Sequence, residues 1–313
     1  MGFFLGIDGG GSKTECVLAD EAGAALARAV GPGANLRRAA AAELRAILNG
    51  CLQRLRRTAG LRVLQPEAVC AGFAGAGESE ARAMARNLLA ELLHPPHLYV
   101  VGDMEVALEA AVGADRGVVL VAGTGAIAYG RNDQGRQARA GGRGPFPSGD
   151  EGSGFDIGCR AVEAAQRAQE VGGETTRLSE SVREGLRQRG IEKLEGCVTP
   201  ESVAEVAALV PCVVEAAHGG DEAARAILEQ AAAALAGLAL AVLRELDLLQ
   251  AEVSVATTGG VFTQSEEVFA GVRERIQPAA PRARVEPLAV APAEGAVRLA
   301  QRLWLQEQAA ARA

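Results

Sequence analysis

Short apolar runs separated by glycine-containing turns dominate the first 30 residues of the chain. Residues 3–8 (FFLGID), 14–20 (TECVLAD) and 24–30 (AALARAV) each have the length and apolar character of a β-strand. The first two runs are joined by a glycine-rich turn, GGGSK. The pattern therefore predicts three consecutive strands at the start of the chain.

Helices then alternate with strands. Apolar side chains in residues 38–60 recur at spacings of three and four, which places them on one face of a helix. A strand is predicted at 67–73, a helix at 78–93 and another strand at 97–101. Alternating strands and helices are typical of a parallel sheet, so these residues complete a first α/β unit.

The strand-rich pattern then begins again. The predicted elements are strands at 118–122, 126–131, 137–142, 253–258 and 284–288, and helices over most of 153–248 and at 265–276 and 292–310. Both halves open with two strands joined at a glycine turn, and this repetition predicts two related domains, 1–115 and 116–291. The last helix, about 292–313, is a candidate to pack back on the first domain.

Composition and charge limit the classes of function. The 313 residues carry a net charge of −7, which favours neither nucleic acid nor an anionic membrane as a partner. The longest apolar stretch, 231–243, is too short to span a bilayer and predicts a buried helix. The six cysteines lack CxxC spacing, and Asp8 interrupts the apolar N-terminal segment. These features are typical of a cytoplasmic protein with reduced thiols, and they argue against a zinc site or a signal peptide.

The two glycine turns are candidates for phosphate binding. The first, GIDGGGSKT (6–14), is not a P-loop, because Ser12 precedes Lys13 and because a strand follows the loop where a P-loop would open a helix. The second, Gly123-Thr124-Gly125, also leads into a strand. Glycine lets the backbone approach a phosphate, and successive N–H groups can form an anion-binding concavity. Either turn alone could be an ordinary hairpin. The pair, with Asp8 placed to hold Mg²⁺ through water, favours a nucleotide site.

Three motifs along the chain belong together. They are Asp8-Gly-Gly-Gly-Ser-Lys-Thr14, Gly123-Thr124-Gly125, and Gly149-Asp-Glu-Gly-Ser153 followed by Asp156-Ile-Gly158. In combination they resemble the BadF/BadG/BcrA/BcrD ATPase family, and within it the N-acetylglucosamine kinases. The resemblance covers nearly the whole chain and is weakest at 165–250. It implies an α/β fold of two actin-like (ribonuclease H-like) domains with a cleft between them, a helical insertion in the second, and ATP held between the domains.

The resemblance also implies roles for individual residues. Those implied to bind ATP and Mg²⁺ are Asp8, Gly9, Gly10, Gly11, Ser12, Lys13, Thr14, Gly123, Thr124, Gly125, Gly259, Gly260 and Thr263, the last three near the adenosine and Asp8 at the metal. Those implied to bind the sugar are Asn35, Asp103, Gly142, Arg143, Gly144, Asp150 and Glu151. Asp103 is the implied catalytic base.

Side-chain chemistry supports two of these roles directly. Asp103 follows a strand and begins a helix, and ligands bind at the carboxyl ends of strands in α/β sheets. A kinase needs a carboxylate to orient the hydroxyl and take its proton, although Asp103 could instead, or also, cap the helix. The amide of Asn35 can both donate to and accept from sugar hydroxyls, and its alternative role is that of a loop or cap residue.

The expected function is ATP-dependent phosphorylation of an amino sugar, with N-acetylglucosamine and its 6-phosphate as the leading substrate and product. Arg143 stands where the family usually has Trp or Tyr, Ala74 where serine is common, and the segment 145–148 is one residue longer than usual. Glucosamine and N-acetylmuramic acid therefore stay open as substrates. Alternatives from other classes are an ATPase activator of an acyl-CoA reductase or dehydratase, which needs cysteines to bridge an iron–sulfur cluster, and a non-catalytic nucleotide sensor. A homodimer also stays open.

Overall fold

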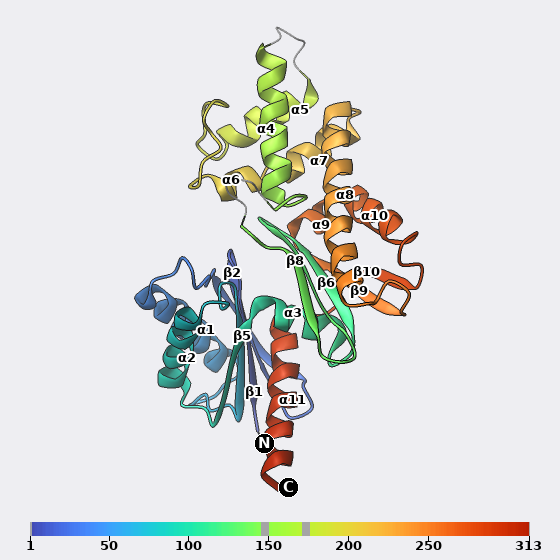
Figure 1. The fold of residues 1–313 in the computed structure, drawn as a ribbon. Coiled ribbons are helices and arrows are strands. Elements are labelled where there is room, and N and C mark those ends of the chain that lie inside the picture. The colour runs from blue at the N-terminus through green and yellow to red at the C-terminus, as the bar shows by residue number, and fades with distance from the viewer. Residues whose placement is uncertain (1, 145–149, 171–175, 313) are drawn as a thin grey trace. The chain divides into compact units, whose positions relative to one another are not determined.

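The computed structural model describes residues 2–144, 150–170 and 176–312 (Figure 1). The chain forms two compact units, unit 1 (Met1–Ala114 with Leu288–Ala313) and unit 2 (Asp115–Pro287). Each unit contains a five-stranded mixed sheet covered by helices.

The sheet of unit 1 has the strand order β3-β2-β1-β4-β5. Its strands are β1 (Phe4–Gly9), β2 (Lys13–Ala19), β3 (Ala25–Pro32), β4 (Ala68–Phe73) and β5 (His97–Gly102). Its helices are α1 (Ala41–Thr58), α2 (Ser79–Leu93), α3 (Asp103–Val112) and α11 (Pro292–Arg312). Because β1, β4 and β5 run parallel, their carboxyl ends lie at the same end of the sheet.

Side-chain alternation along β1 and β2 separates two faces of this sheet. Ile7 and Cys16 belong to the core formed with α1 and α2, whereas Phe4 and Val17 belong to the core formed with α11. The red helix α11 lies along β1 and α3 in unit 1 (Figure 1). This close approach depends on Gly6, where a Cβ atom would lie 2.1 Å from the Ala293 carbonyl oxygen.

Unit 2 repeats this topology with the order β8-β7-β6-β9-β10. Its strands are β6 (Gly117–Ala122), β7 (Ala126–Arg131), β8 (Gln137–Gly141), β9 (Val253–Thr258) and β10 (Ala283–Pro287). As in unit 1, the first strand pairs antiparallel with the second and parallel with the fourth. The internal repetition predicted from the glycine turns is therefore confirmed, and both turns are strand-to-strand hairpins as predicted.

Helices account for most of the rest of unit 2. They are α4 (Gly154–Glu170), α5 (Arg177–Arg187), α6 (Val203–Ala207), α7 (Val210–His218), α8 (Glu222–Glu245), α9 (Gly260–Gln264) and α10 (Glu266–Ile276). By length and composition alone, α8 could cross a membrane, and half of its most apolar window is buried. Leu235, Ala239 and Val242 of α8 belong to the core of unit 2, which is the pattern of a core helix and agrees with the buried helix predicted at 231–243.

The predicted elements agree with the structure to within three residues at their ends. The exception is α9, because no helix was predicted between the strand at 253–258 and the helix at 265–276. The helix near that position is α10, and Ser265 caps it by accepting a hydrogen bond from the Val268 N–H at 3.2 Å. A single helical turn such as α9 is too short to show an apolar period in the sequence.

Candidate active site

Three loops of unit 1 are bonded together at the carboxyl end of its parallel strands. The Ala34 N–H donates to the Gly10 carbonyl at 3.0 Å, and the Ala74 N–H donates to the Gly9 carbonyl at 2.9 Å. The Leu36 N–H donates to the Ala74 carbonyl at 2.9 Å. The structure therefore brings the glycine turn after β1, the loop that carries Asn35 and the loop after β4 into one backbone network.

The tip of the first glycine turn is open. Gly11 and Ser12 are exposed, and no described residue accepts a hydrogen bond from the N–H of either. A Cβ atom on Gly11 would have nothing within 4 Å, whereas a Cβ atom on Gly33 would lie 2.3 Å from the Gly11 carbonyl oxygen. The backbone at Gly33 thus supports the turn from one side and leaves two N–H donors available to an anion such as a phosphate.

Two carboxylates lie near this turn. Asp8 is close to the end of β1, and Asp103 is the first residue of α3, directly after β5. Burial raises the pKa of Asp8 to about 7, with the negative charge of Asp103 as the next cause. Lys13 acts in the opposite direction on this pKa, and Glu15, the cross-strand partner of Asp8, adds to the increase. Burial also raises the pKa of Asp103.

This local excess of negative charge is what a divalent cation would relieve. Within the described residues there is no cluster of three or more His, Cys, Asp or Glu side chains that could hold a metal. Magnesium often binds through one or two carboxylates, water and the phosphates of its substrate, so the residues present fit Mg²⁺ delivered with a nucleotide.

Asp103 is the first residue of α3 and lies outside the N-cap position of that helix. The N-cap position of α3 is Gly102, so Asp103 is not the cap that sequence analysis offered as its alternative role. Its Oδ1 atom accepts a hydrogen bond from the Met104 N–H at 3.0 Å. The Gly102 N–H donates to Glu105 Oε1 at 2.9 Å, so Glu105 and not Asp103 satisfies this N–H group.

Three other predicted residues of unit 1 already have a hydrogen-bond or ion-pair partner. Asn35 Oδ1 accepts a hydrogen bond from the Arg37 N–H at 2.9 Å, as in a loop cap, so its amide NH₂ group is the part that could meet a ligand. Thr14 is buried, and its hydroxyl donates to the Pro32 carbonyl at 2.7 Å. Lys13 is exposed and pairs with Glu15 at 3.2 Å. Thr14 thus supports the hairpin from within, and its contact with ATP stays a prediction.

The second glycine turn is held by a helix. The N–H groups of Gly154 and Phe155, at the start of α4, donate to the carbonyls of Gly123 and Thr124 at 2.7 and 3.4 Å. The turn is closed by the Gly123 N–H, which donates to the Gly125 carbonyl at 2.9 Å. In the described part of the chain, the N–H groups of Thr124 and Gly125 have no acceptor. This turn also offers two backbone donors to an anion.

The predicted adenosine residues lie beside this second turn. Gly259 follows β9, which runs parallel to β6, and its φ of +109° is one that only glycine adopts readily. A Cβ atom on Gly259 would lie 2.3 Å from the Ala122 carbonyl oxygen. Thr263 is exposed, and its hydroxyl donates to the Gly260 carbonyl at 3.1 Å. Within unit 2, the candidate phosphate and adenosine contacts therefore share one end of the sheet.

The predicted sugar residues of unit 2 are only partly assembled. Asp150 is buried, and its carboxylate accepts hydrogen bonds from the N–H of Arg143 at 2.8 Å and of Ala126 at 3.3 Å. Glu151 and the Arg143 side chain are exposed. Gly149 and the longer segment 145–148 lie outside the described residues. The sugar contacts of this group stay predictions, and the carboxylate of Asp150 is already engaged by backbone.

Sequence analysis missed three residues that support these loops. They are Gly33, which contacts the first turn, Glu105, which satisfies the Gly102 N–H, and Asp156, which was named in a motif without this role and whose Oδ2 accepts from the Gly152 N–H at 2.9 Å. A glutamate three residues after an N-cap is a recognised capping signal, so Glu105 could have been found. The contact made by Gly33 is non-local and has no comparable signal in the sequence.

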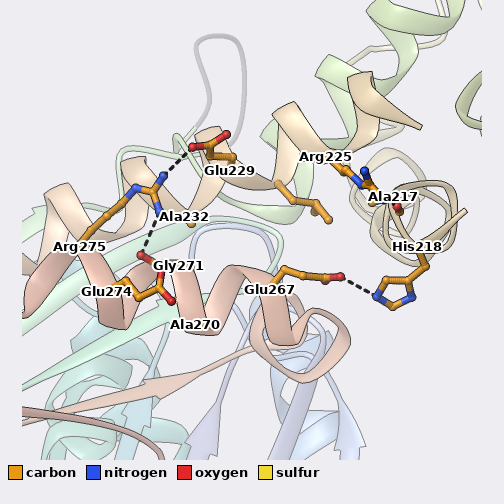
Figure 2. A pocket seen from close by; sticks show the side chains of 11 residues that line it. Ala217, His218, Arg225, Glu229, Ala232, Glu267, Ala270, Gly271, Glu274 and Arg275 are labelled. Atoms are coloured by element: carbon orange, nitrogen blue, oxygen red, sulfur yellow. Dashed lines mark hydrogen bonds and ion pairs between the residues drawn. The ribbon is translucent and has the colours of Figure 1, made fainter. Parts of the chain in front are cut away.

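A surface pocket of about 600 Å³ lies between α7, α8 and α10 (Figure 2). None of the predicted site residues lines it. Figure 2 shows two ion pairs among its charged side chains, His218 with Glu267 at 2.6 Å and Arg275 with Glu229 at 3.1 Å. Because none of the predicted residues lies in this pocket, the candidate site remains at the glycine turns.

Comparison with known proteins agrees with this geometry. Residues 5–300 match the BadF/BadG/BcrA/BcrD ATPase family. This chain belongs to that family. The family match confirms the resemblance carried by the three motifs.

Relatives along the whole chain are sugar kinases. The N-acetylmuramic acid/N-acetylglucosamine kinase of Clostridium acetobutylicum is 30% identical over 303 residues, which are 96% of this chain and 99% of the relative. The N-acetyl-D-glucosamine kinase of Dictyostelium discoideum is 30% identical over 310 residues, which are 95% of this chain and 97% of the relative.

A solved structure from Chromobacterium violaceum, described as a candidate N-acetylglucosamine kinase, has 28% identity and a TM-score of 0.74. The match covers 96% of this chain and 99% of that one. The expected fold class, α/β with two actin-like domains and a helical insertion in the second, is confirmed. In the described chain, α4 to α7 form that insertion between β8 and α8.

Proposed function

We propose that this protein is an ATP-dependent carbohydrate kinase that phosphorylates an N-acetylated amino sugar, with N-acetylglucosamine as the leading substrate. The observation that carries the proposal is the pair of carboxylates, Asp8 and Asp103, beside a glycine turn with two unpaired backbone donors. Relatives that match over 95–96% of the chain are kinases for this class of sugar.

Asp103 has the role of catalytic base in this proposal. A kinase orients the acceptor hydroxyl with a carboxylate and transfers its proton as the phosphoryl group arrives. Burial raises the pKa of Asp103, which makes its carboxylate a better proton acceptor near neutral pH. Asn35, in the loop bonded to the same glycine turn, supplies an amide that can fix a neighbouring sugar hydroxyl.

The glycine turns have the role of phosphate ligands. The N–H groups of Gly11 and Ser12 in unit 1, and of Thr124 and Gly125 in unit 2, have no acceptor among the described residues and are donors for phosphate oxygens. Asp8 would hold Mg²⁺, which neutralises charge on the phosphates when it is bound. Gly259 and Gly260, which follow β9 beside the second turn, have the role of adenosine contacts that the family resemblance implies.

A second substrate, N-acetylmuramic acid, is favoured by Arg143. This side chain is exposed and follows β8, where relatives usually carry an aromatic residue. A guanidinium group pairs well with a carboxylate and repels an ammonium group. Glucosamine should therefore be a poor substrate, and the lactyl carboxylate of N-acetylmuramic acid a tolerated group.

An ADP-release assay with Mg²⁺ and ATP tests this proposal. The sugars to compare are glucose, glucosamine, N-acetylglucosamine, N-acetylmannosamine and N-acetylmuramic acid. We expect the highest kcat/KM with an N-acetylated sugar that has a free 6-hydroxyl. Turnover of ATP that is the same with and without every sugar would contradict a sugar kinase and favour the ATPase activator or the nucleotide sensor.

We also propose a cytoplasmic location. All six cysteines are free thiols in the structure. Thiols stay reduced in the cytosol, and ATP is available there.

A further inference from the structure

Asp150 is a buried acid, 6% exposed, and no basic side chain among the described residues forms an ion pair with it. Its two carboxylate oxygens are satisfied by backbone instead, Oδ1 by the Arg143 N–H at 2.8 Å and Oδ2 by the Ala126 N–H at 3.3 Å. A buried carboxylate is costly unless it is hydrogen-bonded, so these two contacts determine its position.

The two donors belong to different parts of the proposed site. Ala126 directly follows the turn Gly123–Gly125, which is proposed to bind phosphate. Arg143 lies in the segment Gly142–Gly144, which the family resemblance assigns to the sugar. The two segments are also bonded directly, because the Gly142 N–H donates to the Ala126 carbonyl at 2.8 Å.

The contact between Asp150 and the turn leaves little space. A Cβ atom on Gly125 would lie 2.6 Å from Asp150 Oδ2, so the backbone of the turn rests on the carboxylate. The same segment holds the turn at Gly123, through the Gly154 N–H. A displacement of Asp150 would therefore move the turn that carries the two unpaired N–H donors.

We propose that Asp150 is a positioning residue that couples sugar binding at Gly142–Gly144 to nucleotide binding at Gly123–Gly125. A sugar that orders the Arg143 segment holds Asp150 in place, and Asp150 holds the turn in the conformation that binds phosphate. Coupling between two ligands is reciprocal, so nucleotide also raises the affinity for sugar. This inference rests on the proposed kinase function, and it gives Asp150 a role beyond direct contact with the sugar.

Calorimetry with a non-hydrolysable ATP analogue, Mg²⁺ and N-acetylglucosamine tests the coupling. In the wild type we expect the Kd for the analogue to fall about 5-fold or more when the sugar is present. Asp150→Asn keeps the size of the side chain but replaces one accepting oxygen with an NH₂ group. We expect this variant to bind the analogue about 5-fold more weakly without sugar, and to show nearly the same Kd with and without it.

Two further variants separate coupling from general loss of stability. Glu163→Gln removes an exposed carboxylate from α4, away from the proposed site, and should keep the wild-type ratio of the two Kd values. Gly125→Ala displaces the carboxylate from the side of the turn, so it should lose the ratio even if Asp150→Asn does not fold. A purely structural role would lower the melting temperature and leave the ratio unchanged.

The outcomes distinguish this inference from the proposed function. A wild type that binds both ligands with a Kd ratio of one would overturn the coupling and leave the kinase proposal standing. So would an Asp150→Asn protein that keeps its nucleotide affinity and loses only its sugar affinity. A wild type that binds neither the analogue nor the sugar would overturn the kinase proposal and, with it, the coupling.

Discussion

Two aspartates, one in each unit, show how differently a carboxylate can be used in the same topology. Asp150 in unit 2 is buried and is satisfied by two backbone N–H groups. Asp8 in unit 1 has a pKa raised to about 7 because burial, Asp103 and Glu15 all disfavour its charge. A satisfied carboxylate fixes the positions of neighbouring segments, whereas an unsatisfied one is prepared for a cation or a proton.

The two glycine turns differ in the groups that support them. The turn of unit 1 is supported by neighbouring loops, through the Gly9 and Gly10 carbonyls, and its tip is open. The turn of unit 2 is supported by the first N–H groups of α4 and by Asp150. The turn of unit 1 thus lies beside two carboxylates of raised pKa, whereas the turn of unit 2 is held by helix N–H groups and by one hydrogen-bonded carboxylate.

The largest expected effect is the loss of turnover in an Asp103 variant. Asp103→Asn removes the proposed proton acceptor and keeps the shape of the side chain, so kcat should fall roughly 10²–10⁴-fold. Binding of Mg·ATP, measured by calorimetry, should change little. Near-normal turnover would contradict a catalytic role and leave Asp103 with only a structural role in the first turn of α3. The comparison between a reactive carboxylate in unit 1 and a structural one in unit 2 would then fail.

The next effect concerns the pH dependence of stability at Asp8. Its pKa is raised from 3.8 to about 7 in the folded, ligand-free protein, so the folded state holds a proton more tightly than the unfolded state. The free energy of unfolding should therefore fall as pH rises from about 4 to 7. In Asp8→Asn this loss should be absent. The free energy of unfolding of the variant, relative to that of the wild type, should therefore be higher at pH 8.5 than at pH 5.5 by on the order of 1–2 kcal/mol.

Urea unfolding of both proteins at the two pH values measures this difference. Mg·ATP should stabilise the wild type more than Asp8→Asn at pH 8.5, because only the wild type offers a carboxylate to the ion. Parallel pH profiles for the two proteins would show that Asp8 carries no such unsatisfied charge.

A matched pair of glycine variants compares the two turns. Neither Gly11 nor Gly123 has any atom within 4 Å of the position of a Cβ atom, so valine should fit the fold at both sites. Each side chain would project into the space proposed for phosphates, and each variant should bind the ATP analogue roughly 10-fold more weakly or worse. Circular dichroism checks the fold, and unchanged affinity in either variant would assign that turn no part in phosphate binding.

The smallest effect is expected on stability at Lys13. Its ion pair with Glu15 is exposed on the lysine side, and such pairs contribute little. Lys13→Gln should change the free energy of unfolding by less than about 0.5 kcal/mol. If stability is unchanged, any loss of nucleotide affinity in this variant can be assigned to a lost contact between Lys13 and phosphate. A large loss of stability would contradict the small contribution expected of the ion pair.

The sequence by itself determined the repeated strand–turn–strand pattern, the α/β fold class and the place of Asp103 after a strand. These features are local, because apolar periodicity and glycine turns depend on neighbouring residues. The three motifs also carried the resemblance to the family, because each is a short run of neighbouring residues that can be read from the sequence.

Only the tertiary structure decided which groups are free to act. Thr14 and Asp150 look like ligand-binding residues in the sequence, but the hydroxyl of Thr14 is used by Pro32 and the carboxylate of Asp150 by Ala126 and Arg143. These contacts join residues that are 18, 24 and 7 positions apart in the sequence, and no local pattern encodes them. The raised pKa of Asp8 likewise requires Asp103, 95 residues away in the sequence, to be brought to the same end of the sheet, because electrostatic interaction depends on distance in space.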